Sequence, residues 1–152
     1  MQISNRFSVA VHILLCVDAF SDSQKMTSDI LAGSVGVNPV VIRRTLGSLK
    51  KAGLVDVAAG TGGSKLARPS SDITLLDIYL AVEPVEGGRL FSIHNRPNPQ
   101  CPVGSAINPL LERRMRQAQK ALEDELAGVT LHELLQDMND NGSASCSTSF
   151  SD

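Results

Sequence analysis

Apolar residues return every three or four positions in the first fifty residues, and this spacing predicts three helices. The first helix covers about residues 4–20. Thr27 can cap a second, short helix, which Gly36 interrupts. Asn38 can cap a third helix with Pro39 at its first position, and Gly53 ends that helix near residue 52. The buried stripes are expected to be Phe7, Ala10 or Val11, Leu14 and Val17 in the first helix, Ile30, Leu31 and Val35 in the second, and Ile42, Leu46 and Leu49 in the third.

The pattern changes after Gly53. LVDVA alternates as a strand does, the glycine-rich AGTGG follows, and SKLARP can return as a second strand, which together predict a β-hairpin. Thr74 and Asp77 then have the spacing of a capping box at the start of another helix, TLLDIYLAVE. The expected fold is mainly α with a small β-hairpin wing.

The second half of the chain has a different organisation. Residues 84–108 show no periodicity and hold four of the seven prolines, so a loop is expected. A long helix is predicted from about Pro109 to Ala127, and Thr130 with Glu133 forms a second capping box before LHELLQDM. The expected organisation is 1–83 as a first domain, 84–106 as a loop with a possible sensing role, 107–138 as a long helix and a C-terminal helix, and 139–152 as a disordered tail.

Three helices with a glycine-containing turn, followed by a glycine-tipped hairpin, have the order of a winged helix-turn-helix. Such a fold lays one helix in the major groove of DNA and lets the hairpin reach the backbone. When Ile42, Leu46 and Leu49 face inward, helical rotation turns a basic stripe outward. A glycine inside that helix costs about 1 kcal/mol relative to alanine, and a close approach to DNA or to the preceding helix can compensate. The expected DNA contacts are Asn38, Val40, Arg43, Arg44, Gly47, Ser48, Lys51, Lys65 and Arg68.

Charge is unevenly distributed. Residues 1–70 carry eight Lys and Arg against four Asp and Glu, a net of +4, whereas residues 71–152 carry six against twelve, a net of −6. The net charge of the chain, −2, therefore hides a basic first half that suits double-stranded DNA, although an uneven solvated surface is an equally good explanation.

Composition excludes several other classes. No apolar run approaches the roughly 18 residues of a membrane span, and the N-terminal stretch lacks a cleavage site, so a cytoplasmic protein without a membrane partner is expected. The three cysteines lie far apart and form neither a disulfide framework nor a zinc site. No Ser-His-Asp order, carboxylate cluster or phosphate-binding loop is present, and we expect no enzyme activity.

The stretches NPVVIRRTLGSLKKAGLV and GTGGSKLAR resemble the recognition helix and wing of the Rrf2 family of bacterial transcription regulators. DITLLDIYLAVE and the region from CPVG to TLHELL fit the later helices of the family, and the resemblance covers about residues 1–138. It implies a homodimer, often a repressor, in which the long helix crosses to a partner subunit and the pair reads a near-palindromic operator. An apolar stripe of this kind could equally be buried within one subunit. The implied dimerisation residues are Ile107, Leu111, Met115, Ala118, Leu122 and Leu126.

The sequence departs from the family members that hold an iron–sulfur cluster. Those members use three closely spaced cysteines before the long helix, whereas residues 84–108 contain only Cys101, so no cofactor or metal is expected. The segment FSIHNRPNPQCPVG resembles instead a branch without a cluster, similar to the YwnA-type regulators. Some members of that branch sense oxidants or electrophiles through a cysteine at this place, and a helix N-terminus after Cys101 can stabilise a thiolate. A loop thiol without a role is the alternative.

Two further functions remain open from the sequence. The protein could be a winged-helix adaptor that binds other proteins and no DNA, in which case its binding should depend little on salt. It could also be a regulator gated by a small molecule, with no role for the thiol.

Overall fold

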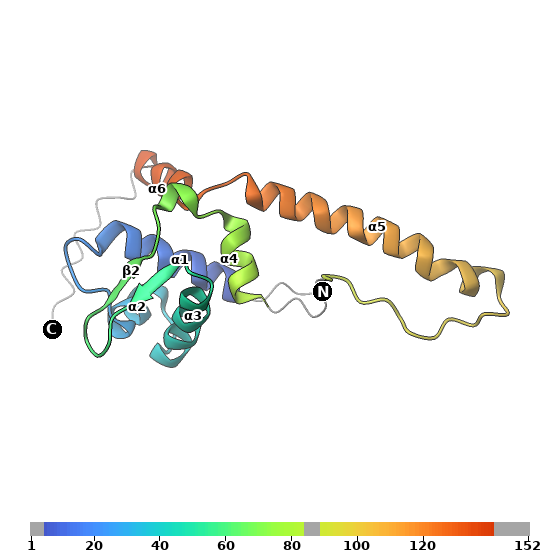
Figure 1. The fold of residues 1–152 in the computed structure, drawn as a ribbon, viewed down its shortest axis with the longest axis horizontal. Coiled ribbons are helices and arrows are strands. Elements are labelled where there is room, and N and C mark those ends of the chain that lie inside the picture. Colours follow the sequence, from blue (N-terminus) through green and yellow to red (C-terminus); the bar gives the residue numbers. More distant parts are fainter. Residues whose placement is uncertain (1–4, 84–88, 142–152) are drawn as a thin grey trace.

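The computed structural model describes residues 5–83 and 89–141, which form two parts of different shape (Figure 1). The first part, called the body below, comprises residues 5–83 and 128–141. The second part, called the arm, comprises residues 89–127 and projects to one side of the body. No helix in the described part of the chain combines the length and the apolar character needed to cross a membrane.

The first three helices of the body form where the sequence predicts them. They are α1 (Arg6–Phe20), α2 (Ser28–Val35) and α3 (Pro39–Lys51). The Thr27 side chain accepts a hydrogen bond from the backbone N–H of Ile30 at 3.4 Å and caps α2. Gly36 ends α2 with a φ of 75°, a left-handed conformation that glycine adopts without a steric cost. Local signals therefore set the bounds of these helices.

The predicted hairpin is also present. Strands β1 (Val55–Val57) and β2 (Ser64–Leu66) pair antiparallel, with Asp56 opposite Lys65. A single turn of 3-10 helix, η1 (Ser70–Asp72), leads from the hairpin to the next helix.

Two helices close the body, and both begin with the predicted capping boxes. They are α4 (Leu75–Val82), capped by Thr74, and α6 (Leu131–Asp140), capped by Thr130. Their N-termini are joined: the N–H of Leu75 donates to the carbonyl of Val129 at 2.9 Å, and the N–H of Leu131 donates to the carbonyl of Ile73 at 2.8 Å. These two bonds fasten the end of the arm to the body.

The core of the body surrounds α1. Ala10, Leu14 and Val17 are fully buried as predicted, whereas Phe7 and Val11, the alternative to Ala10, are only half-buried. The predicted stripe of α1 is too narrow because α2, α3, α4 and α6 all pack against this helix, so more than one of its faces is covered. The largest fully buried side chains come from these five helices, the hairpin and the segments next to them: Ile13, Leu14, Met26, Leu31, Ile42, Leu49, Leu54, Ile73, Ile78, Leu131, Val17 and Val55.

The predicted start of the long helix is wrong. Helix α5 runs from Pro102 to Ala127, 26 residues, so it begins inside the stretch 84–106 that we expected to be a loop. Pro102 takes the favourable first position, and Pro109, which resembles a helix start in the sequence, lies in the helix interior. The tail boundary also shifts because α6 extends to Asp140; residues 142–152 lie outside the described part, and so do 84–88 of the expected loop.

The rest of the arm is a segment without helix or strand, residues 89–101, which runs back along α5 (Figure 1). The N–H of Leu90 donates to Oε1 of Gln119 at 3.1 Å, and Nδ2 of Asn108 donates to the carbonyl of His94 at 3.3 Å. The arm therefore consists of α5 and the segment 89–101, called the strap below, which these two hydrogen bonds hold along the helix.

Candidate nucleic-acid interface

The inner side of α3 anchors it to the body. Ile42, Leu46 and Leu49 are buried, as predicted. Thr45 is buried as well, and its hydroxyl donates to the carbonyl of Val41 at 2.9 Å, so the polar atom is satisfied. The sequence analysis missed Thr45, although its position three residues after Ile42 places it on the same face.

The outer side of α3 carries the side chains predicted to contact DNA. Val40 is 55% exposed, Arg43, Arg44 and Lys51 are exposed, and Ser48 is half-buried. The helix has four cations, with Lys50 as the fourth, and no acidic residue. None of the ion pairs within residues 5–83 and 89–141 involves these cations. The exposed surface of α3 therefore carries positive charge that no ion pair with the described residues compensates.

The structure shows the surroundings of Asn38, the N-cap of α3, and of Gly47 inside the helix. Oδ1 of Asn38 accepts the N–H of Val40 at 2.8 Å, so this side chain caps the helix and keeps only its amide N–H groups for another partner. A Cβ at Gly47 would meet no atom within 4 Å. A close approach to the preceding helix therefore does not explain this glycine.

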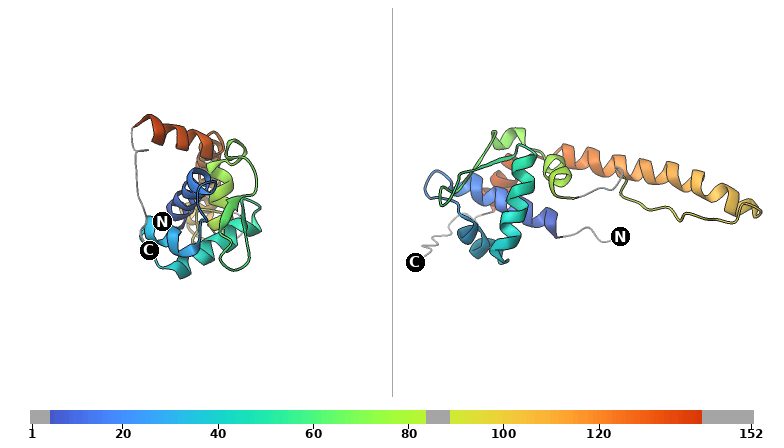
Figure 2. Two further views of the ribbon diagram at one scale, coloured as in Figure 1. Left: turned by 90° about the vertical axis from the view of Figure 1, so that its left-hand side faces the viewer. Right: turned by 60° about the horizontal axis from the view of Figure 1, so that its bottom comes forward.

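The wing and α3 share a side of the body. In Figures 1 and 2 both lie away from α6. Gly63, with a φ of 80°, brings the wing close to the chain before α2, because a Cβ there would lie 2.8 Å from the backbone nitrogen of Met26. The N–H of Ser64 then donates to the carbonyl of Met26 at 2.9 Å. Lys65 is exposed on β2, where Asp56 of β1 is its cross-strand partner.

Arg68 occupies a different position from the other cations predicted to bind DNA. Its Nη2 lies 3.1 Å from Oδ2 of Asp77 on α4, and the same oxygen accepts the N–H of Thr74 at 2.9 Å. Arg68 thus lies at the base of the wing and connects it to the first turn of α4.

A polar link between α1 and α2 has no counterpart in the sequence analysis. Nε2 of His12 and Sγ of Cys16 lie 3.1 Å and 3.3 Å from the hydroxyl oxygen of Ser34. Burial raises the pKa of the Cys16 thiol, and the hydrogen bond with Ser34 opposes that shift only in part. Only the i, i+4 spacing of His12 and Cys16 signals a common face, and no sequence pattern points to Ser34.

Cys101 is the exposed thiol of the described residues. It is the residue before the first turn of α5, and its N–H donates to the carbonyl of Asn98 at 3.2 Å. His94 and Arg96 are exposed in the same strap.

The predicted dimerisation stripe lies along α5. None of the 26 residues of this helix is buried. Ile107, Met115, Leu122 and Leu126 are half-buried, whereas Leu111 (37% exposed) and Ala118 are exposed. One chain by itself therefore does not cover the apolar side of its longest helix.

Comparison with known proteins identifies this arrangement. A profile of the Rrf2 family, described as iron-dependent transcriptional regulators, matches residues 3–137. The chain belongs to the Rrf2 family of transcriptional regulators. It is 41% identical over 133 residues to YwnA of Bacillus subtilis (strain 168), a protein assigned as an HTH-type transcriptional regulator, and this match covers 88% of the chain and 96% of YwnA.

Solved structures agree with the fold. A protein of Lactobacillus plantarum assigned as a transcriptional regulator superposes with a TM-score of 0.74 at 30% identity, covering 93% of this chain and 94% of that one. CymR, the global cysteine regulator of B. subtilis, superposes with a TM-score of 0.64 over 90% of this chain and 97% of its own, and at 20% identity it supports the fold alone. The predicted winged helix and the absence of an enzymatic function agree with this family.

The description of the Rrf2 family names iron, and a protein that binds iron needs several side chains that can act as its ligands. Within the described residues of one chain, no group of three or more His, Cys, Asp or Glu side chains could hold a metal ion. Cys101 is exposed on the arm and Cys16 is buried in the body, so these two thiols do not converge. The described residues of one chain do not fit an iron–sulfur cluster, and no step below uses one.

Proposed function

We propose that this Rrf2 protein is a cytoplasmic transcriptional repressor that binds a near-palindromic operator as a homodimer and needs no metal cofactor. The observation that carries the proposal is the two-sided character of α3: its aliphatic side is buried in the body, and its exposed surface holds four cations that form no ion pair with another described residue. A helix of this kind fits the major groove of DNA, where side chains can reach both base edges and phosphates.

The residues of α3 divide into two roles by their position. Arg43 and Arg44 lie in the N-terminal half, which enters the groove first, and can donate to guanine or phosphate oxygens. Val40 can contact a thymine methyl group. Lys51 in the last turn, with Lys65 on the wing, is placed for phosphates, which add affinity without reading sequence.

Two small residues and two flanking residues complete this interface. Gly47 lets the DNA approach the helix closely, and Ser48 lies at its edge. Asn38 caps α3 and can donate from Nδ2 to a phosphate. Arg68, tied to Asp77, fixes the base of the wing and contributes positive charge beside it.

We also propose that Cys101 receives the signal. Its thiol is exposed at the N-terminus of α5, whereas the other described thiol, Cys16, is buried with a raised pKa. With a quinone, the thiol of Cys101 adds to a ring carbon: its S–H bond breaks as the S–C bond forms, an electron pair of the ring moves to the quinone oxygens, and the thiol proton and the hydrogen of the attacked carbon end on these two oxygens as a hydroquinone adduct. Bulk added between the strap and α5 then displaces the arm and changes the spacing of the two α3 helices.

Binding to the DNA upstream of the protein's own gene tests the proposal. Arg44→Ala should weaken binding by about 1–3 kcal/mol and relax the preference at one base pair of the operator. Lys51→Ala should weaken binding to all sequences similarly and lower the salt slope by about one unit. Arg113→Ala, which removes an exposed cation of the arm, is the matched control and should leave affinity unchanged. If none of these variants differs from the native chain, or if the native chain shows no salt-dependent binding, the adaptor function is favoured.

The signal is tested with the same DNA. A quinone should release the native chain from the operator and leave Cys101→Ser bound. Release of Cys101→Ser to the same extent would refute the thiol sensor and favour gating by a small molecule, without affecting the DNA-binding proposal.

A further inference from the structure

The wing has a neighbour besides its own two strands. Met26, in the segment before α2, forms an antiparallel bridge with Ser64 of β2, and the N–H of Ser64 donates to the carbonyl of Met26 at 2.9 Å. Gly63 permits this approach, because a Cβ there would lie 3.2 Å from the Cα of Lys25. Strand β2 therefore lies between β1 and the segment before α2.

The register of this bridge places two lysines side by side. In an antiparallel pair, the residue before one member of a bridge lies opposite the residue after the other, so Lys25 lies opposite Lys65. Met26 and Ser64 are buried, and successive side chains point to opposite faces, so both lysines point away from the core. Both are exposed. Across β1, Asp56 is opposite Lys65, so the outward face carries the row Lys25, Lys65, Asp56.

This row is unfavourable for the free protein. Like charges directly opposite each other on neighbouring strands are destabilising. None of the ion pairs within residues 5–83 and 89–141 involves Lys25 or Lys65, and Asp56 lies on the far side of Lys65 from Lys25. An anion bound between the two ammonium groups would relieve their repulsion.

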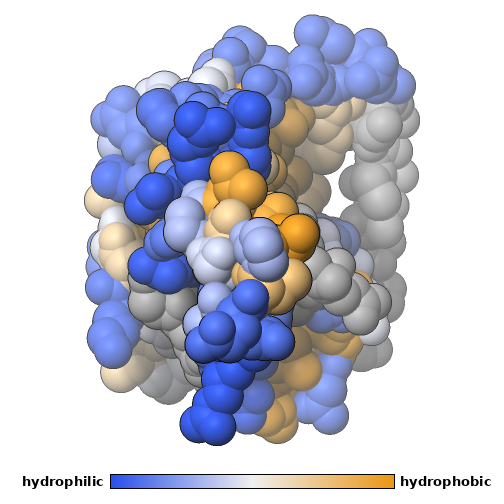
Figure 3. Space-filling view, turned by 90° about the vertical axis from the view of Figure 1, so that its right-hand side faces the viewer, coloured by the Kyte–Doolittle hydropathy of each residue, from blue (hydrophilic) through white to orange (hydrophobic). Residues whose placement is uncertain are grey.

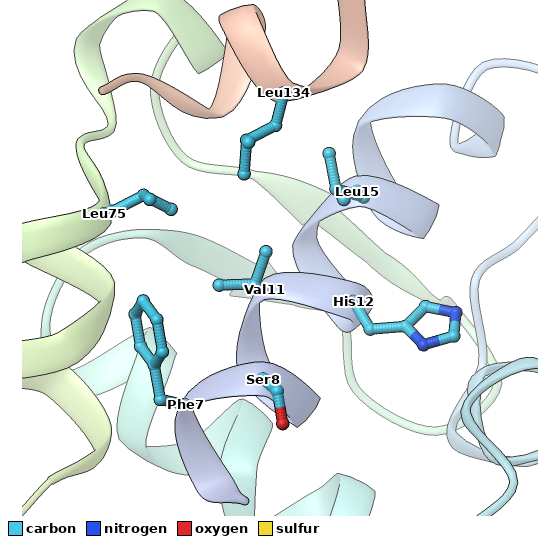
Figure 4. Close-up of a pocket in the computed structure, with 7 residues that line it drawn as sticks. All are labelled: Phe7, Ser8, Val11, His12, Leu15, Leu75 and Leu134. Carbon is cyan, nitrogen blue, oxygen red and sulfur yellow. The ribbon is translucent and has the colours of Figure 1, made fainter. Parts of the chain in front are cut away.

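The surroundings of the two lysines favour a polyanion over a protein partner. The core of a protein interface is apolar, and the apolar surfaces of the described residues lie elsewhere. One is a hollow of about 360 Å³ between α1, α4 and α6 (Figure 4), and another is at the end of the arm, where Figure 3 shows apolar side chains gathered between polar ones. The large exposed apolar side chains of the described residues are on α3, α4 and α5: Val40, Val41, Leu80, Val103, Leu110 and Leu111.

The position of the lysines in the fold relates them to α3. Lys25 lies three residues before the start of α2, and α2 packs against α3. The wing that carries Lys65 lies on the same side of the body as α3 in Figures 1 and 2. Duplex DNA carries one negative charge per about 1.7 Å of its axis, so a duplex that binds α3 presents further phosphates on both sides of the groove.

We propose that Lys25 and Lys65 together form a site for the backbone phosphates of the DNA that α3 binds, with Lys25 as a DNA contact outside both α3 and the wing. This inference rests on the DNA binding of the proposed function and adds a contact residue and the shared site. Phosphate contacts read no sequence, so the site adds affinity for every duplex.

The salt dependence of binding tests the contact of Lys25. Lys25→Ala should weaken binding to the operator and to a duplex of unrelated sequence by the same factor, and should lower the salt slope by about 0.9 units for each contact removed. Over a fourfold rise in salt, the advantage of the native chain over the variant should therefore shrink about 3.5-fold per contact. Arg113→Ala, which removes one exposed cation of the arm, is the matched control and should keep the native slope. A native slope in Lys25→Ala would overturn the inference.

A charge reversal separates binding from stability. Lys25→Glu places a carboxylate opposite Lys65, so its midpoint of denaturant unfolding should be equal to or above that of the native chain. Its affinity for DNA should fall further than that of Lys25→Ala, because a like charge then faces the phosphates. A lower unfolding midpoint would show that Lys25 supports the fold, and unchanged affinity would show that it does not face DNA; either result would overturn the inference.

Uncharged phosphate analogues test whether the two lysines share a site. In duplexes that carry a single methylphosphonate, Lys25→Ala should have no further effect at one backbone position, because the contact is already lost there. Lys65→Ala should lose its effect at the same phosphate or at the adjacent one. Positions further apart would refute the shared site. A native chain that binds DNA as strongly as Lys25→Ala does refutes this inference alone, whereas a native chain without salt-dependent binding refutes the proposed function.

Discussion

The body and the arm both contain helices, but they bury their apolar side chains to different extents. The body buries its core residues around α1 within a single chain. The arm contains a longer helix with ion pairs of its own but no side-chain N-cap bond, and none of the residues of that helix is buried. A helical sequence pattern therefore specifies a helix in both regions, but only in the body does the chain also supply the surface that covers it.

The difference matters because local interactions stabilise a helix only weakly in water. The arm has ion pairs of the i, i+4 kind, Lys120 with Asp124 at 2.7 Å and Arg116 with Glu112 at 3.8 Å, but exposed pairs contribute little. Tertiary packing is the usual source of helix stability. The body has that packing, whereas the described residues of one chain leave every residue of α5 without full burial.

The largest expected contrast is between two leucine truncations. Leu14→Ala in the fully buried core of the body should lower the free energy of unfolding by about 2–5 kcal/mol. Leu111→Ala on the arm should change the unfolding of the dilute chain little, and should instead weaken dimerisation. Denaturant unfolding at several protein concentrations measures both effects. If both variants lost the same free energy of unfolding at all protein concentrations, the contrast between the two regions would be contradicted.

Two glycines give the next contrast. Gly63→Ala places a Cβ 2.8 Å from the backbone of Met26 and forces alanine to a φ of 80°, so it should lower the free energy of unfolding of the body by about 1–3 kcal/mol. Gly104→Ala also meets backbone, at the carbonyl of Asn98. There it should displace only the strap, because the strap is not part of the core. Hydrogen exchange should rise throughout the body in the first variant and locally in the second.

Substitution of Gly47 should change the free energy of unfolding and the affinity for DNA in opposite directions. Gly47→Ala meets no atom within 4 Å and replaces a poor helix former, so it should raise the free energy of unfolding by up to about 1 kcal/mol. If DNA approaches this position closely, the same variant should bind DNA more weakly. A more stable protein with unchanged affinity would show that the DNA does not approach Gly47.

The smallest expected effect lies at the joint between the arm and the body. Hydrogen bonds from the backbone N–H and the hydroxyl of Thr130 lower the pKa of Glu133. A carboxyl whose pKa is lowered by folding stabilises the folded state above its ordinary pKa of about 4.3, and this contribution is lost as the pH falls through the folded-state value. The native chain should therefore be more stable than Glu133→Gln near pH 7, and the two should converge in acid. Thermal unfolding at several pH values tests this, and a difference independent of pH would contradict it.

The predictions from the sequence succeeded where a short segment contains its own signal. Thr27, Asn38, Thr74 and Thr130 each cap a helix as expected, because a cap involves residues two or three positions apart. The exposed outer side of α3 follows from helical periodicity in the same way. The predicted start of α5 was wrong because Pro102 and Pro109 both resemble a first helical position, and the sequence pattern alone does not distinguish them.

The sequence by itself determined the caps, the hairpin and the two-sided character of α3, because each depends on neighbours within one or two turns. The tertiary structure decided the burial of Thr45, the bond between Arg68 and Asp77, the polar link of His12, Cys16 and Ser34, and the exposure of the whole arm. These features join residues from different elements, and their distances depend on how the helices pack around α1. No local pattern encodes those distances.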